Sequence, residues 1–508
     1  MKISTEIKKY ISYGLLIVMV SAMIFVIISI IKSAYLYQYD NDEFYHVQRV
    51  YLIASGFKPY TSFFFIFSNI FHTLLVPLFI FFGFSFATLA KARIFMIVLF
   101  AIRVILIALI INKIFNRRVA LIFIPLFLFD PFTIFSSMQI RPDNLMMTIY
   151  SLGMFIFILG FFKSSKFLLF VSGVAFGLSS LILIKIAPQL LILLIAYCFY
   201  CIRYRKFKDF LFFIDGLGLS LFVFCFYHLV NGSFFPMFKQ VFIFSFTLSN
   251  LIINQVSYGF FHQPNNGFIY GLMGKPLTWM YVWILPLLAG IGAYLTLSSS
   301  NKEQEKIEII NNKKKQLIQM TLVASLVIQY IFLLYLNTVF IQYYIPFQWL
   351  LALFAAVMID DLIFIQFKSV IFHQLITICL IAIFFALSYV SVQANNARTF
   401  FRTEYQISQF APIWSKVPKD SAIFPNILFR RIVYPITEQY NQENYDYFYS
   451  SMGNMVPSYI GSFEKNKLPF LIIDNPETFY TLEPGMEKYV KDHFQKIDGQ
   501  INLYKRVK

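Results

Sequence analysis

Long apolar segments alternate with short polar connections along the chain. Most of them approach the roughly 20 residues that cross a bilayer as a helix, and they lie at residues 11–32, 63–86, 92–112, 118–138, 144–162, 167–183, 186–202, 209–230, 279–298, 318–339, 344–364 and 369–391. The pattern predicts an all-α polytopic membrane protein. The first segment follows Lys8 and Lys9, but it is long and lacks a clear small-residue cleavage site, so we expect a retained helix rather than a signal peptide.

The basic residues predict how these segments are oriented. They cluster in four connections, at Lys113/Arg117/Arg118, Lys163/Lys166, Arg203/Arg205/Lys206/Lys208 and Lys313/Lys314/Lys315. With the N-terminus inside, all four connections are cytoplasmic only if 63–86 does not cross the membrane. We therefore expect about eleven transmembrane helices, with 63–86 as a re-entrant or interfacial segment. The external side then carries 33–91, the turn at Arg141, Lys185, the loop 231–278 and the C-terminal segment, while 299–317 is cytoplasmic.

The C-terminal segment differs from the rest in composition. Residues 392–508 hold 14 Lys and Arg against 12 Asp and Glu, a near balance typical of a water-exposed domain. Short β-prone runs at 422–424, 470–473 and 501–507 predict strands. We therefore divide the chain into a membrane domain, residues 1–391, and a small external α/β domain, residues 392–508.

Composition excludes several functions. The chain has 508 residues, of which 59% are hydrophobic and only 13% are charged. A soluble domain does not need so large a share of hydrophobic residues. Most of its net charge of +17 lies in the membrane part, so it indicates membrane orientation and no nucleic-acid partner. The sequence has no phosphate-binding glycine loop and no His/Cys cluster with metal spacing. Its cysteines all lie in apolar segments, where we expect small buried hydrophobic residues: Cys198, Cys201, Cys225 and Cys379.

Acidic residues are scarce in the membrane part, which makes one cluster informative. The first 302 residues hold eight acids, and Asp40, Asp42 and Glu43 are three of them. Carboxylates beside a bilayer are costly and are usually functional. Asp42 and Glu43 open a predicted helix at 44–55, so they could simply cap it. For Glu43 both roles can hold, whereas for Asp42 we expect a functional role at the external surface.

Two further external features carry charge. Arg141 and Asp143 form a turn at Pro142, where Asp143 either caps the next helix or supports chemistry. Lys185 lies at the mouth between two segments, where it either snorkels or holds a phosphate. Within the membrane, Arg103 and Asp130 lie at similar depths in adjacent segments, so we expect them to form a structural ion pair.

Three motifs resemble a known family. Asp42-Glu43-Phe44-Tyr45-His46, continuing to Tyr60, resembles the first external loop of bacterial GT-C glycosyltransferases, the relatives of protein O-mannosyltransferases and the lipid A aminoarabinose transferase. Ile140-Arg141-Pro142-Asp143 resembles that family's second external turn, and Gln342-Tyr343-Tyr344-Ile345-Pro346 its late motif. The resemblance covers about residues 10–390. Two positions depart from the pattern, because Ser68-Asn69 replaces a His-rich stretch and Gln139 stands where an acid is common.

The resemblance implies the GT-C fold and transfer of a hexose or pentose from a polyprenyl-phosphate donor to a glycan, lipid or protein acceptor. It places the protein in the bacterial cytoplasmic membrane, with the active site and C-terminal domain outside. It implies Asp42 as catalytic base with Glu43 and Asp143 in support, and substrate contacts from Tyr45, His46, Tyr343 and Tyr344. No metal ligand is assigned, although a divalent cation stays an open alternative.

The chemistry agrees with these residues. A lipid phosphate leaves as a stable anion, so one carboxylate suffices to deprotonate the acceptor hydroxyl, and displacement from the opposite face inverts the anomeric carbon. Fixed cations must stabilise the phosphate, and the external candidates are Arg141, Lys185 and Lys58. Two alternatives stay open: a transporter or flippase of lipid-linked saccharides, which would more often carry mid-membrane charges and repeated halves, and a catalytically inert relative.

Overall fold

The structure is a computed structural model of the chain. It describes residues 5–63, 65–243, 284–299, 309–335, 341–364, 370–398, 402–417, 423–424, 458–465, 467–473, 476–481, 483–498 and 502–508. Most of the loop 231–278 and part of the loop 299–317 lie outside the described residues.

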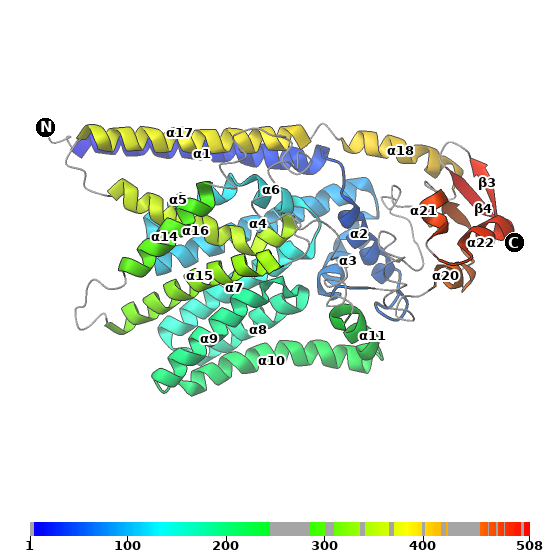
Figure 1. Ribbon diagram of the computed structural model, residues 1–508, viewed down its shortest axis with the longest axis horizontal. Helices are drawn as coiled ribbons and strands as arrows, with labels where there is room; N and C mark the ends of the chain where they lie inside the picture. The colour runs from blue at the N-terminus through cyan, green and yellow to red at the C-terminus, as the bar shows by residue number, and fades with distance from the viewer. Residues whose placement is uncertain are drawn as a thin grey trace.

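A bundle of long helices forms the membrane domain (Figure 1). Its helices are α1 (Thr5–Leu36), α4 (Phe86–Ile114), α5 (Arg117–Leu128), α6 (Pro131–Met138), α7 (Pro142–Lys163), α8 (Lys166–Ile182), α9 (Ala187–Arg203), α10 (Phe207–Val230), α14 (Leu285–Ser299), α15 (Ile309–Tyr335), α16 (Ile345–Phe364) and α17 (Val370–Arg398). In the described part of the chain, eight helices are long and apolar enough to span a membrane, and α8 and α14 are shorter apolar helices. The predicted polytopic helical architecture is therefore confirmed.

Small residues let two of these helices approach closely. Gly173 of α8 faces the carbonyl of Phe213, and Gly216 of α10 faces the carbonyl of Phe170; a Cβ at either glycine would collide with that oxygen. Close contacts of this kind are common in membranes, where helix association depends on packing rather than on water. The pair α8 and α10 is therefore a tightly packed unit at one side of the bundle.

The predicted helix at 118–138 is interrupted. It divides into α5 and α6 at Asp130 and Pro131, because a residue before proline disfavours the helical conformation. Asp130 then accepts a hydrogen bond from Thr133 Oγ1, at 2.6 Å, in the first turn of α6.

The break also overturns the expected ion pair. Arg103 donates to Ser137 Oγ at 2.6 Å, and its guanidinium carbon lies 4.9 Å from the ring centre of Phe100. Among the described contacts of Arg103 there is none with Asp130. The expected pairing requires one continuous helix through 118–138, and the turn at Pro131 removes that geometry.

Short helices cover one end of the bundle. They are α2 (Asn41–Ala54), α3 (Ile70–Phe82) and α11 (Phe234–Phe238) (Figure 1). With 13 residues, α3 reaches about 20 Å at 1.5 Å per residue, which is too short to cross a bilayer of about 30 Å. Its length agrees with the expectation that 63–86 does not span.

The C-terminal domain follows α17, which continues past the predicted boundary at residue 391 to Arg398. Its elements are α18 (Thr403–Lys416), β1 (Ile423–Phe424), α20 (Tyr459–Lys465), β2 (Phe470–Ile472), α21 (Pro476–Tyr480), α22 (Met486–His493), β3 (Phe494–Asp498) and β4 (Leu503–Arg506). The described strands form a four-stranded sheet in the order β1-β2-β4-β3, with β1 and β2 parallel and the other pairs antiparallel. The strand at 494–498 was not predicted.

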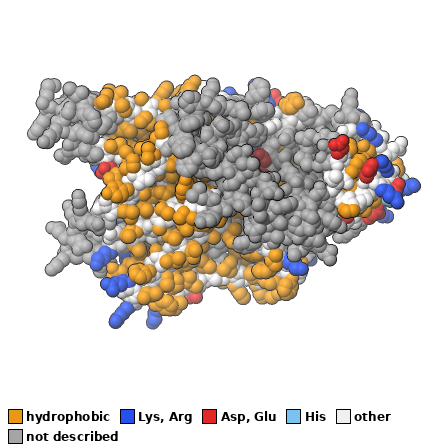
Figure 2. Space-filling model, viewed as in Figure 1, with side chains coloured by type: hydrophobic (Ala, Val, Ile, Leu, Met, Phe, Trp, Pro, Cys, Tyr) orange, Lys and Arg blue, Asp and Glu red, His pale blue; other side chains and the backbone are white. Residues whose placement is uncertain are grey.

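Side-chain polarity separates the two parts of the molecule. Figure 2 shows hydrophobic side chains over the helix bundle and mixed charges over the C-terminal domain at one end. Basic side chains gather at the opposite end of the bundle. A hydrophobic band between two polar ends is the surface expected of a protein that spans a bilayer.

Candidate active site

The acidic cluster begins α2 with a reciprocal cap. Asp40 Oδ1 accepts the N–H of Asp42 at 2.8 Å, and Glu43 Oε2 accepts the N–H of Asp40 at 3.0 Å, which completes a capping box. Two of the three acids are thus used to start the helix. The side chain of Asp42 is instead 52% exposed, so it is the acid of this cluster that a substrate can reach.

Glu43 is fully buried and lies at the junction of several elements. Arg93 of α4 donates Nε to Glu43 Oε1 at 2.8 Å and Nη2 to Oε2 at 2.5 Å. The N–H of Ile140 donates to Oε1 at 3.1 Å. Arg93 also donates to the carbonyls that follow α1, at Tyr37 (2.7 Å) and Gln38 (2.9 Å). Glu43 therefore fixes the start of α2 against α1, α4 and the turn before α7.

Asp42 begins a chain of four charged side chains of alternating sign. Arg141 Nη1 donates to Asp42, Arg141 Nε lies 3.4 Å from Asp143 Oδ2, and Lys185 Nζ lies 2.8 Å from Asp143 Oδ1. Burial lowers the pKa of Arg141, but the carboxylates of Asp42 and Asp143 outweigh it and raise that pKa above its usual value. The structure thus brings together Asp42, Arg141, Asp143 and Lys185, all of which the sequence had selected.

The four side chains differ widely in exposure. The side chain of Asp42 is 52% exposed, that of Lys185 15%, that of Arg141 8% and that of Asp143 1%. Asp143 is therefore a buried anchor for the two cations rather than a group that meets substrate. The arrangement presents one accessible carboxylate beside two positioned cations, the combination required by transfer from a phosphate leaving group.

Asp40 and Gln139 lie behind Asp42. Gln139 Nε2 is 3.5 Å from Asp40 Oδ2. Burial, reinforced by the charge of Asp42, raises the pKa of Asp40 to about 6. Gln139, the position that departs from the family pattern, thus contacts the capping acid and adds no further negative charge to it.

The late motif reaches the same site. Tyr343 belongs to the 3-10 helix Ile341–Tyr344, and Lys185 Nζ lies 4.2 Å from the centre of its ring. Tyr344 is buried, with 1% of its surface exposed. Tyr343 is therefore the member of this pair that borders the charged cluster, and its ring supports the ammonium of Lys185 by a cation–π contact.

Tyr45 and His46 point into the layer between α2 and α3. His46 Nδ1 lies 2.9 Å from His72 Nε2, and the guanidinium of Arg49 lies 4.2 Å from the ring centre of Tyr45. Burial lowers the pKa of His46 well below its usual value and that of His72 to about 3. This neutral pair joins the two helices, so the geometry gives His46 a packing role.

Lys58 is exposed in the loop after α2, and it is not among the partners of Asp42, Arg141, Asp143 or Lys185. Arg93 was not among the residues predicted from the sequence. The available signal was an arginine at the start of the apolar segment 92–112, since a charge in a membrane helix must find an internal partner. Within the described residues, no group of three or more His, Cys, Asp or Glu side chains could hold a metal ion.

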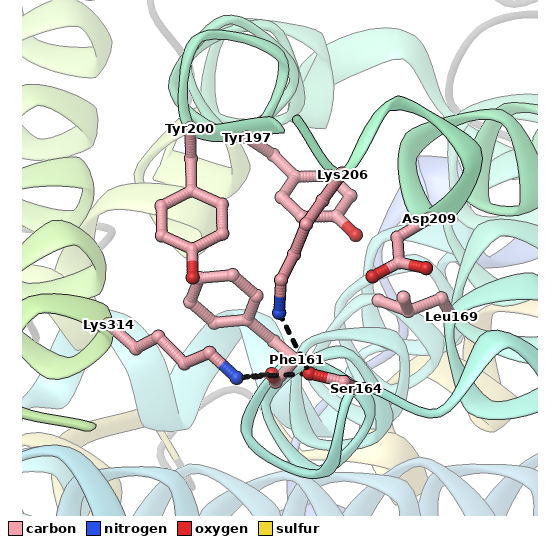
Figure 3. A pocket seen from close by; sticks show the side chains of 8 residues that line it. All are labelled: Phe161, Ser164, Leu169, Tyr197, Tyr200, Lys206, Asp209 and Lys314. Atoms are coloured by element: carbon pink, nitrogen blue, oxygen red, sulfur yellow. Dashed lines mark hydrogen bonds between the residues drawn. The ribbon is translucent and has the colours of Figure 1, made fainter. Parts of the chain in front are cut away.

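A second polar group lies at the other end of α7. Lys206 and Lys314 converge on Ser164 Oγ, at 3.2 and 3.3 Å (Figure 3). Lys314 also donates to the carbonyl of Phe161 at 2.5 Å. Lys314 thus satisfies two of the last carbonyls of α7, those of Phe161 and Phe162, and both lysines complement the dipole of this helix. With 22 residues, α7 separates this group from the candidate active site by about 33 Å.

The comparisons with known proteins agree with this geometry at the level of the fold. No family model and no curated protein sequence matches the chain. Among solved structures, it is similar to ArnT from Cupriavidus metallidurans bound to undecaprenyl phosphate, with 12% identity, a TM-score of 0.58 and coverage of 99% of this chain and 98% of that one. The apo state of the same ArnT gives a TM-score of 0.61 at 12% identity, covering 93% and 95%.

An archaeal protein gives a further match. The oligosaccharyltransferase AglB from Archaeoglobus fulgidus, in complex with an inhibitory peptide and a dolichol-phosphate, is 11% identical with a TM-score of 0.55. The match covers 98% of this chain and 74% of that one. The similarity to both proteins extends over nearly the whole of this chain, so the chain has the fold of the GT-C membrane glycosyltransferases.

Proposed function

We propose that this protein is a glycosyltransferase that moves a sugar from a polyprenyl-phosphate donor to an acceptor hydroxyl at the external face of the membrane. The observation that carries this proposal is the exposed carboxylate of Asp42, held by Arg141 beside the cation Lys185. The shared fold supports the donor class, since the similar ArnT and AglB structures contain undecaprenyl phosphate and dolichol-phosphate.

In the proposed reaction Asp42 accepts the proton of the acceptor hydroxyl as its oxygen bonds to the anomeric carbon. The bond between that carbon and the phosphate oxygen breaks, and polyprenyl phosphate leaves with the bonding electrons. A single displacement of this kind inverts the anomeric centre. Because the leaving group is already a stable anion, the site needs no strong general acid.

The cations have a matching role. Arg141 uses Nε and Nη1 for the two aspartates, and an arginine has further N–H donors for a phosphate oxygen. Lys185 contacts Asp143 and the face of Tyr343, and its ammonium has three donors. Asp143 holds both cations in place before the donor arrives, which limits the reorganisation needed during reaction.

We place the protein in a bacterial cytoplasmic membrane with this site outside, and the acceptor is a hydroxyl of a glycan, lipid or protein. Cells that lack the protein identify both substrates: mass spectrometry of their surface glycans and lipids should show one sugar missing. Wild-type protein should restore that sugar, and so should Asp209→Asn, a matched acid-to-amide change at the first turn of α10 near the opposite end of the bundle.

Asp42→Asn is the critical variant. Asparagine keeps the size of the side chain but cannot take a proton, and loss of a general base typically lowers rate by about 10²–10⁴-fold. We expect normal folded yield and almost no restored sugar. Near-normal restoration by Asp42→Asn would exclude it as the base. Loss of lipid-linked saccharide export, without any transfer by purified wild-type protein, would favour a transporter.

A further inference from the structure

A glutamine in the C-terminal domain forms two hydrogen bonds with the backbone just before the acidic cluster. Gln406 of α18 accepts the N–H of Tyr39 at 2.9 Å through Oε1 and donates Nε2 to the carbonyl of Tyr39 at 3.0 Å. Gln406 is 2% exposed. One side-chain amide thus satisfies both hydrogen-bonding groups of a single residue, as a neighbouring β-strand would.

Other contacts of the same kind surround this clamp. Thr403 Oγ1 donates to the carbonyl of Tyr37 at 2.9 Å, and Tyr37 pairs with Arg402 in an antiparallel β-bridge. The first turn of α18 therefore binds the segment that joins α1 to α2. Gln406 and Tyr39 are separated by 367 positions in the sequence.

Tyr39 connects this clamp to the start of α2 in two ways. Its backbone leads directly into Asp40, which caps α2. Its ring lies 4.0 Å from the guanidinium of Arg93, the partner of Glu43. A displaced Tyr39 would therefore disturb both the cap and the buried ion pair that together set the direction of Asp42.

We propose that Gln406 is a positioning residue through which the external C-terminal domain holds Asp42 in its reactive orientation. This inference rests on the proposed function, in which Asp42 is the base. Gln406 touches no substrate, because it is buried against Tyr39. Its effect is on geometry, and small misplacements of a reacting group, of about 1 Å, can cost about 10²-fold in rate.

The first test is structural and needs no substrate. Gln406→Ala removes both hydrogen bonds, so amide exchange in a peptide covering 37–54 should accelerate, while a peptide from α7, covering 145–160, should be unchanged. Ser408→Ala, on the exposed side of the same helix, is the matched control and should leave both peptides unchanged. Unaltered exchange in 37–54 of Gln406→Ala would overturn the inference.

The second test measures transfer with polyprenyl-phosphate hexoses and pentoses as probes. Gln406→Ala should lower kcat about 10–100-fold with little change in donor KM, since the donor cations belong to α7 and to the segment of Lys185. A purely destabilising change would lower the active fraction and be rescued at low temperature. Faster exchange with unchanged kcat would contradict a positioning role.

Gln406→Glu adds a measurement, the pH dependence of kcat relative to wild type, that a change in stability alone would not alter. A protonated glutamic acid can accept from and donate to Tyr39 as glutamine does, whereas its carboxylate can only accept and repels the carbonyl. The ratio of its kcat to that of wild type should therefore fall as pH rises, whereas the ratio for Gln406→Ala should stay flat. Dividing by wild type cancels the influence of Asp40, Glu43 and Arg93, the charged groups near Tyr39, because both proteins contain them. If the kcat ratio of Gln406→Glu did not change with pH, the proposed role of the Gln406–Tyr39 hydrogen bonds would be refuted.

The two proposals fail in different ways. If wild-type protein transfers no sugar from any probe, the proposed function is wrong, and the exchange experiment still decides whether Gln406 holds residues 37–54. If wild-type protein is active and the Gln406 variants match it, only the positioning role is wrong.

Discussion

At the scale of single residues, neighbouring carboxyl groups occupy different environments and so have different tasks. Asp42 is exposed and meets Arg141, Glu43 is buried against Arg93, and Asp40 caps α2. The sequence selected Asp42, Arg141, Asp143 and Lys185, because charges are rare in apolar chains and costly to retain. It did not distinguish exposed from buried acids, since adjacent positions on a helix point in different directions.

The raised pKa of Asp40 predicts a pH-dependent stability. In the unfolded chain this carboxyl loses its proton near its ordinary value of 3.8, whereas the native protein holds it to about pH 6. The native state binds more protons between these values, so stability falls as pH rises, by at most about 3 kcal/mol. Asp40→Asn keeps a good helix cap and should abolish this decline.

The measurement is the midpoint of thermal unfolding of purified protein between pH 4 and pH 7. Wild type should lose stability relative to Asp40→Asn as pH rises through this interval. Asp361→Asn, an exposed acid on α16, should follow wild type. Parallel curves for wild type and Asp40→Asn would show that Asp40 is not the titrating group.

At the scale of elements, the apolar pattern located the spans but not their interruptions. The helix positions follow from runs of apolar residues, which indicate length and direction. The break at Pro131 was missed because proline often occurs inside membrane helices, as Pro125 does in α5. The contacts Glu43–Arg93 and Gln406–Tyr39 join residues far apart in the sequence, and no local pattern identifies such partners.

The Glu43–Arg93 pair predicts a non-additive pair of substitutions. Arg93→Leu leaves the buried carboxylate of Glu43 without its counter-charge, which should cost about 3–5 kcal/mol. The double variant Arg93→Leu/Glu43→Gln removes that uncompensated charge and should recover part of the loss. Folded yield and unfolding temperature report both effects.

Arg118→Leu serves as the control, because the side chain of Arg118 is 54% exposed in its pair with Asp360 and surface pairs contribute little. The single variant Glu43→Gln completes the set. A double variant at least as unstable as the sum of Arg93→Leu and Glu43→Gln would argue against coupling between Glu43 and Arg93.

At the scale of the whole molecule, charge is distributed between two ends. The helix α2, which the acidic cluster begins, and the C-terminal domain lie toward one end of the molecule (Figure 1). Lys206 and Lys314 contact Ser164 at the far end of α7. Basic ends face the cytoplasm in membrane proteins. Reporter fusions at Lys313 and at residue 500 should therefore report opposite sides of the membrane, and the same side for both would refute the predicted orientation.

The pairing of the first and last membrane helices has a consequence for biosynthesis. α1 and α17 lie side by side (Figure 1), and Asn395 Nδ2 donates to Ser29 Oγ at 2.9 Å, both residues being buried. The ribosome must add more than 300 residues before α1 meets this partner, and α18 emerges later still. The acidic cluster at residues 40–43 is thus among the first parts to be translated. It is among the last to reach its final position, because α17 and α18 are made so late. A nascent chain halted before α17 should expose Ser29 to lipid and remain a substrate for membrane quality-control proteases. Only full-length chains can therefore fold completely and escape degradation.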